Sequence, residues 1–132
     1  NKAAIVAAGG IEVLMSLARD GNEAQKERAA GALRILAYND DNEAAIAAAG
    51  GVEVLVSLAR DGNERQKQRA AAALCNLTDN DDNEAVIAAI AAAGGIEVLV
   101  SLARDGNERQ KQRAAAALCN LSANDDCCGR RH

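Results

Sequence analysis

The chain has 132 residues and a net charge of −4, and 49% of it is hydrophobic although only 1% is aromatic. This mixture favours helices, because Ala and Leu have the highest helix propensities and the chain contains no Pro. It argues against a β-sandwich or barrel, which needs aromatic and β-branched strands, and its acidity argues against nucleic acid as a partner.

An internal repeat dominates the chain. Residues 1–41 and 42–82 align without gaps and differ at 11 positions. A period in the low forties is typical of a solenoid built from short helices. We divide the chain into repeats at residues 1–41, 42–82 and 83–126, and we expect the remaining residues 127–132 to form a disordered tail.

The identity between repeats exceeds what packing requires, because protein cores tolerate many apolar exchanges. It indicates either recent duplication or consensus-style engineering, and the sequence leaves both open. The third repeat carries three extra residues between Asn83 and Ala91. We expect them to lengthen its first helix by about one turn, with Ile87 and Ile90 both facing inward.

Each repeat is expected to form three helices, whose boundaries are clearest in the second repeat. Its first helix is predicted to begin at Asn42 and to end at Gly50 and Gly51, where glycine can adopt the left-handed conformation. Its second helix is predicted over residues 52–60, and Gly62 ends it.

The third helix of the repeat has a recognisable start. Asn63 is a favourable N-cap, and Gln66 follows it at the spacing of a capping box. We expect this helix to continue to about Leu77 and to bury a stripe made of Ala70, Ala73, Leu74 and Leu77.

Neither a membrane span nor a disulfide is expected. The longest charge-free apolar run, residues 85–96, is shorter than the about 20 residues that a membrane helix needs. Cys75 and Cys119 occupy equivalent repeat positions, so no pairing follows from their placement. We expect reduced thiols in a cytoplasmic or nuclear protein.

The sequence offers no arrangement for catalysis or for a metal. His132 is the single histidine, so no triad or Cys-His pair can form in the repeats. Residues 79–84 lack the Gly and Glu of a calcium loop, and Cys127 and Cys128 lack zinc-site spacing. We expect no enzyme, no cofactor and no metal site.

The chain resembles the armadillo repeat family over residues 1–126. The segments AAGGI, VLVSLARDGN and ERQKQRAAAALCNL follow the three-helix order and repeat length of that family. The Gly-Gly-Ile before the second helix is most similar to plant-type and vacuolar armadillo-only proteins. The resemblance implies an all-α, right-handed α-solenoid of three armadillo repeats, whose concave groove binds a protein or an extended peptide.

An Asn near the end of the third helix hydrogen-bonds the peptide main chain in this family, and its matches are Asn76 and Asn120. The alternative is a helix-end Asn that bonds nearby carbonyl groups. Ala72 and Ala116 stand where nuclear-import and designed peptide-binding members carry Trp. This difference argues against nuclear-import cargo as the ligand.

Arginines share the helix face that carries this Asn, because positions 65, 69, 72 and 76 lie on one side of the third helix. Relatives often place Glu there, so the resemblance implies a preference for acidic, extended peptides. Asp61 and Glu64 are expected to offset part of the charge. The alternative is a solvated face whose Arg stems cover alanines. The candidate arginines are Arg28, Arg65, Arg69, Arg109 and Arg113.

The ends of the solenoid suggest self-association. Repeat three has the same apolar stripe as repeat two, and no capping sequence follows it. Solenoids normally need terminal repeats with a polar outer face, so we expect end-to-end stacking. A structural or engineered module without a natural ligand remains the alternative function.

Overall fold

The computed structural model describes residues 9–38, 40–79 and 84–122, and every regular element within them is a helix. In chain order the helices are α2 (Gly10–Asp20), α3 (Glu23–Leu36), α4 (Asp40–Ala48), α5 (Gly51–Asp61), α6 (Glu64–Leu77), α7 (Glu84–Ala92), α8 (Gly95–Asp105) and α9 (Glu108–Leu121). The predicted all-α fold is therefore confirmed.

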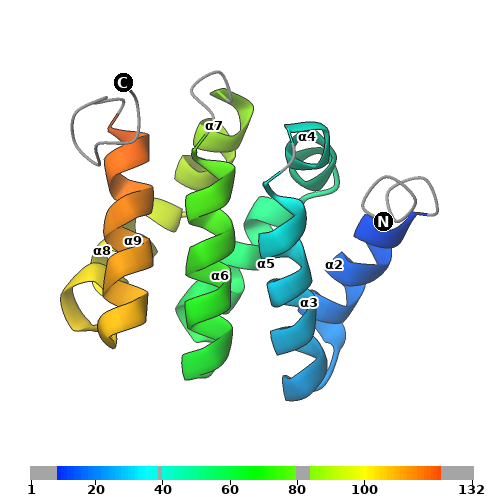
Figure 1. Cartoon of the computed structure of the whole chain (residues 1–132), viewed down its shortest axis with the longest axis horizontal. Helices are drawn as coiled ribbons and strands as arrows, with labels where there is room; N and C mark the ends of the chain where they lie inside the picture. Colours follow the sequence, from blue (N-terminus) through cyan, green and yellow to red (C-terminus); the bar gives the residue numbers. More distant parts are fainter. Residues whose placement is uncertain (1–8, 39, 80–83, 123–132) are drawn as a thin grey trace.

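The helices stack as a solenoid (Figure 1). Helices α3, α6 and α9 lie side by side and form what we call the helix-three row. Helices α2, α5 and α8 lie behind this row, and α4 and α7 lie at one edge of it. Segments about forty residues apart in the sequence thus become neighbours, as a solenoid requires.

The glycine pair between the first and second helices of a repeat acts as predicted. Gly50 has φ 83°, in the left-handed region that glycine adopts without steric cost. A Cβ on Gly51 would lie 2.4 Å from Ile46 Cγ2, so this position also needs glycine for close packing. Helix α4 begins at Asp40, two residues before the predicted Asn42.

The extra turn predicted for the first helix of repeat three would precede Glu84, so the described residues do not test it. Helices α4 and α7 both have 9 residues, so the described residues contain no extra turn. Ile90 is fully buried, as predicted, Ile87 is partly buried, and Val86 is fully buried in addition. When α7 and α4 are aligned on the glycine pairs that follow them, Val86 takes the position of the buried Asn42. Residues 80–83 lie outside the described residues.

The third helix of each repeat begins with a capping box, as predicted for Asn63 and Gln66. Asn63 Oδ1 accepts a hydrogen bond from the Gln66 backbone N–H at 2.8 Å, and Gln66 Oε1 accepts one from the Asn63 N–H at 3.0 Å. Two donors that a helix N-terminus leaves unpaired are thereby satisfied. The same capping box begins α3, through Asn22 and Gln25, and α9, through Asn107 and Gln110.

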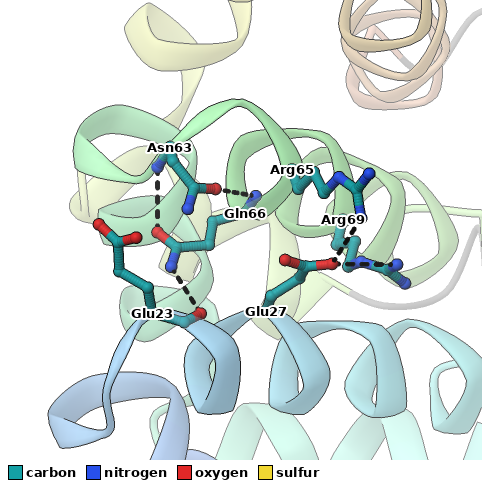
Figure 2. A network of polar contacts seen from close by, with 6 residues as sticks. All are labelled: Glu23, Glu27, Asn63, Arg65, Gln66 and Arg69. Carbon is teal, nitrogen blue, oxygen red and sulfur yellow. Dashed lines mark hydrogen bonds and ion pairs between the residues drawn. The ribbon is translucent and has the colours of Figure 1, made fainter.

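The capping glutamine also joins one repeat to the next (Figure 2). Gln66 Nε2 donates to the Glu23 carbonyl oxygen at the start of α3, at 3.0 Å. Gln110 Nε2 makes the equivalent bond to the Glu64 carbonyl oxygen at 2.9 Å. Both glutamines are buried, whereas Gln25 is exposed. One amide therefore caps its own helix and fixes the height of the neighbouring one.

The cysteines differ from our expectation of equivalent reduced thiols. Cys75 in α6 forms no disulfide, but Cys119 at the same position of α9 is disulfide-bonded. The expectation is therefore wrong for Cys119.

No single helix among the described residues is long and apolar enough to cross a membrane. Two pairs of consecutive helices are together long and apolar enough to span a membrane, but each pair is sharply bent. The bend between residues 41–48 and Gly51–Asp61 is 77°, and that between Glu84–Ala92 and Gly95–Asp105 is 79°.

Replacing Gln66 by Glu should separate the two roles of this side chain. Glu keeps the acceptor of the capping box but loses the donor to the Glu23 carbonyl and places a carboxylate in a buried site. We expect the free energy of unfolding to fall by about 1–3 kcal/mol, measured by urea denaturation. The control is Gln25→Glu, which should stay within about 0.5 kcal/mol of the parent. Equal losses in both variants would show that the bond between repeats contributes nothing.

Candidate functional site

The two asparagines singled out in the sequence are engaged inside the solenoid. Asn76 Nδ2 donates to the Arg34 carbonyl oxygen of the preceding repeat at 2.9 Å. Asn120 Nδ2 donates to Thr78 Oγ1 at 3.1 Å and to the Cys75 carbonyl oxygen at 3.3 Å. Both side chains are buried. The amide donors assigned to a peptide main chain therefore bond helix-end carbonyls in this structure, as the alternative interpretation described.

The junction between α3 and α6 carries two of the candidate arginines on one carboxylate (Figure 2). Glu27 Oε2 lies 3.3 Å from Arg69 Nη2 and 3.7 Å from Arg65 Nη1. The like charges of Arg65 and Arg69 are thus offset by the preceding repeat. The expected offset by Asp61 does not occur, since Asp61 pairs with Arg60 at 3.2 Å.

A glycine allows Arg69 to lie close to α3. A Cβ added to Gly31 would be 3.0 Å from Arg69 Nη1, which is tighter than an ordinary contact. Arg69 is half-buried here, whereas its counterpart Arg113 in α9 is exposed. Ala72 replaces Gly31 at the second junction, so the Cβ that Arg69 avoids is present beneath Arg113.

The junction between α6 and α9 has the same backbone but different electrostatics. Gln68 stands where the first junction has Glu27, so the carboxylate is replaced by a neutral amide. Within the described ranges, no carboxylate lies at ion-pair distance from Arg34, Arg109 or Arg113. Three guanidinium groups on this side of the row are therefore unpaired.

These unpaired groups border a hollow of about 200 Å³ on the helix-three row. Arginines from all three helices of the helix-three row line it, and no acidic side chain does. Its lining residues are Arg34, Gln68, Arg69, Ala72, Arg109 and Arg113. We call this site the arginine hollow. Another hollow of about 300 Å³, between α2 and α5, mixes Arg19 and Lys26 with Glu53 and has no single sign of charge.

The structure therefore brings together only some of the candidate residues. Arg69, Arg109 and Arg113 meet at the arginine hollow, Arg65 lies beside Glu27, and Arg28 is exposed on α3 away from the hollow. Sequence reasoning missed Arg34, Glu27 and Gln68. The sequence did mark these residues, because they stand at positions where repeats one and two differ. Glu27 corresponds to Gln68, and Arg34 corresponds to Cys75.

Two segments considered as metal sites fall largely outside the description. Residues 80–83 of the acidic loop and the whole of residues 127–132 belong to the undescribed part of the chain. Within the described part, no group of three His, Cys, Asp or Glu residues is placed to hold a metal ion.

A model of the Armadillo/beta-catenin-like repeat matches residues 1–38, 39–79 and 83–123. The chain belongs to the armadillo repeat family. The three helices described in each of repeats two and three, and the stacking in Figure 1, agree with this assignment. No curated protein matches this armadillo chain.

Solved structures similar to this armadillo chain include engineered proteins. One engineered protein has a TM-score of 0.86 and 38% identity over 96% of this chain and 51% of its own. A second has a TM-score of 0.85 and 39% identity, over 96% of this chain and 31% of its own. A designed armadillo repeat protein in complex with the peptide (KR)4 has a TM-score of 0.84 and 25% identity, over 97% of this chain and 54% of its own. The chain thus spans about half or less of the length of these proteins.

Replacing Asn76 by Asp should test the role of its amide in the free protein. Asp has the same shape but cannot donate, so it would face the Arg34 carbonyl with a second acceptor. We expect the free energy of unfolding to fall by about 1–3 kcal/mol without any ligand. Gln112→Glu adds the same charge at an exposed position of α9 and should change stability by at most about 0.5 kcal/mol. An unchanged stability of Asn76→Asp, combined with lost peptide affinity, would return Asn76 to the ligand site.

Proposed function

We propose that this armadillo protein is a binding scaffold, without catalytic activity of its own, that holds an extended acidic peptide along the helix-three row. The single observation that carries the proposal is the arginine hollow, where four of the six lining residues are arginines from α3, α6 and α9. A guanidinium group is always charged and pairs with carboxylates in a planar, bidentate geometry, so this surface favours anionic side chains.

The spacing of the row suits a chain in extended conformation. Packed helices lie about 8–10 Å apart, and an extended chain advances about 3.3 Å per residue. Each repeat can therefore meet roughly two to three ligand residues. Exposed ion pairs contribute only about 0–1 kcal/mol each, so three repeats should bind at about micromolar affinity or weaker.

The similar designed protein supports a peptide as the class of ligand, because it was solved in complex with (KR)4. That ligand is basic, whereas the arginines on this helix-three row would repel Lys and Arg side chains. We therefore infer the same kind of ligand with the opposite charge.

The test is fluorescence anisotropy with matched Glu-rich and Lys-rich peptides at low and high salt. We expect the Glu-rich peptide to bind more tightly, and salt to weaken it because exposed charges are screened. The double variant Arg109→Glu with Arg113→Glu should lose about tenfold in affinity for the Glu-rich peptide, since two pairs become repulsive.

A charge-matched control is Arg60→Glu with Arg104→Glu, two exposed arginines at the ends of α5 and α8 that pair with their chain neighbours. It should keep the affinity for the Glu-rich peptide within about twofold, because its charges lie outside the row. Equal affinity of the parent protein for both peptides would make the arginines a solvated face only.

A second candidate function, end-to-end self-association, is favoured by exposed apolar side chains at both ends. Val13 is 59% exposed at one end, whereas its counterparts Val54 and Val98 are 8% and 7% exposed inside the stack. At the other end Val100 is 41% exposed, whereas its counterpart Val56 is 1% exposed and packs under the next repeat. Each end thus exposes an apolar position that is buried where successive repeats stack.

Such a contact joins two different surfaces, so it would build open chains of molecules rather than closed dimers. We expect the sedimentation coefficient of the parent to rise with concentration in the range of about 10–100 μM, since partial burial of a few Val and Ile side chains contributes only a few kcal/mol. The single variant Val13→Lys should remain monomeric, while Ser101→Lys on the exposed face of α8 should behave as the parent. Monomeric parent protein throughout this range would exclude self-association.

A further inference from the structure

The arginine hollow differs from the other junction in a way that specifies one ligand group. At the first junction a single carboxylate, Glu27, already forms ion pairs with both Arg65 and Arg69. At the second junction the corresponding residue is the neutral Gln68, and Arg34 and Arg113 add two further guanidinium groups. The two junctions thus differ in whether a carboxylate of the protein itself faces the arginines.

The size and composition of the hollow restrict what can fill it. A volume of about 200 Å³ is below the roughly 300–1,000 Å³ of pockets for whole small molecules, so one side chain is the better match. A carboxylate has one charge and two oxygens. A phosphoryl monoester has a charge of about −1.5 to −2 at neutral pH and three acceptor oxygens, which can serve several guanidinium groups at once.

The arginines come from three different helices, which also favours a group with three oxygens. Arg34 comes from α3, Arg69 from α6, and Arg109 and Arg113 from α9, so the donors approach from three helices rather than from one. Arg69 uses Nη2 for Glu27 and keeps its other donors. Arg109 and Arg113 are exposed and carry no paired carboxylate, so neither needs to break an ion pair to meet a ligand.

We propose that the arginine hollow is a subsite for one phosphorylated side chain of the extended peptide. This inference rests on the proposed peptide-binding function and assigns its strongest ligand group to the α6–α9 junction. The first junction is closed to such a group because Glu27 occupies the equivalent place. A single phosphorylated residue would therefore fix the register of the peptide along the helix-three row.

The probes are three labelled peptides with the same neutral flanks and a central phosphoserine, Glu or Ser, measured by anisotropy. At pH 7.5 the phosphoserine peptide should bind about tenfold more tightly than the Glu peptide. At pH 5.0 this preference should fall, because the second phosphate ionisation has a pKa near 6 whereas a Glu side chain stays largely ionised. Inorganic phosphate should compete only at concentrations at least about tenfold higher than the phosphopeptide.

The decisive variants exchange the residues that distinguish the two junctions, Glu27 and Gln68. Gln68→Glu installs at the second junction the carboxylate of the first, so it should remove the preference for phosphoserine over Glu. Glu27→Gln makes the opposite change, frees Arg65 and Arg69, and should retain the preference. The control Ser101→Glu adds the same charge as Gln68→Glu at an exposed position of α8 and should keep the tenfold ratio. Urea denaturation of each variant establishes that it is folded.

The outcomes separate this inference from the proposed function. Equal binding of the phosphoserine and Glu peptides overturns the phosphoryl subsite but leaves an acidic-peptide scaffold. A preference that survives Gln68→Glu places the phosphate elsewhere and overturns the assignment. Competition by inorganic phosphate as strong as by the phosphopeptide overturns the peptide as its source. No binding of either acidic peptide, including the Glu-rich one, overturns both proposals.

Discussion

The stacking of this solenoid depends on a glutamine amide that serves two repeats at once. The carbonyl of Gln66 accepts from the N-cap backbone of its own helix, and its NH2 group donates to the backbone of the preceding one. The geometry of the two bonds fixes the height of α6 relative to α3, and Gln110 does the same for α9. A buried amide that lost either partner would cost free energy, so the register is specified strongly.

The electrostatic character of the helix-three row follows from this register. Because α3, α6 and α9 stand at equal heights, a residue at one position always faces the same positions of the next helix. Glu27 consequently meets Arg65 and Arg69, and Gln68 is placed beside Arg109 and Arg113. Interactions in a solenoid are confined to neighbouring repeats, so one exchange of Glu for Gln changes the field locally without changing the fold.

The asparagines near the ends of α6 and α9 complement the glutamines at the other ends of these helices. Asn76 and Asn120 donate to carbonyls in the last turn of the preceding helix three, where backbone carbonyls lack an N–H partner further along the helix. Ile35 occupies this position in α3, where it is exposed. Each inner junction is thus bonded near both ends, and the apolar stripe of Ala and Leu fills the space between.

The sequence by itself determined the fold class, the repeat and most helix boundaries, because these depend on local signals. Gly50, the Asn63 capping box and the apolar spacing of α6 act within a few residues, and the structure agrees with all three. The site was predicted less completely. Arg69, Arg109 and Arg113 could be assigned to one face, but the pairing of Glu27 with Arg69 and the inclusion of Arg34 could not. These contacts join residues about forty positions apart, and only the stacking of helices decides which side chains of neighbouring repeats meet. The same reason applies to the partners of Asn76 and Asn120. The sequence placed both residues near the end of the third helix, but only the tertiary structure showed that they bond carbonyl groups of the preceding repeat.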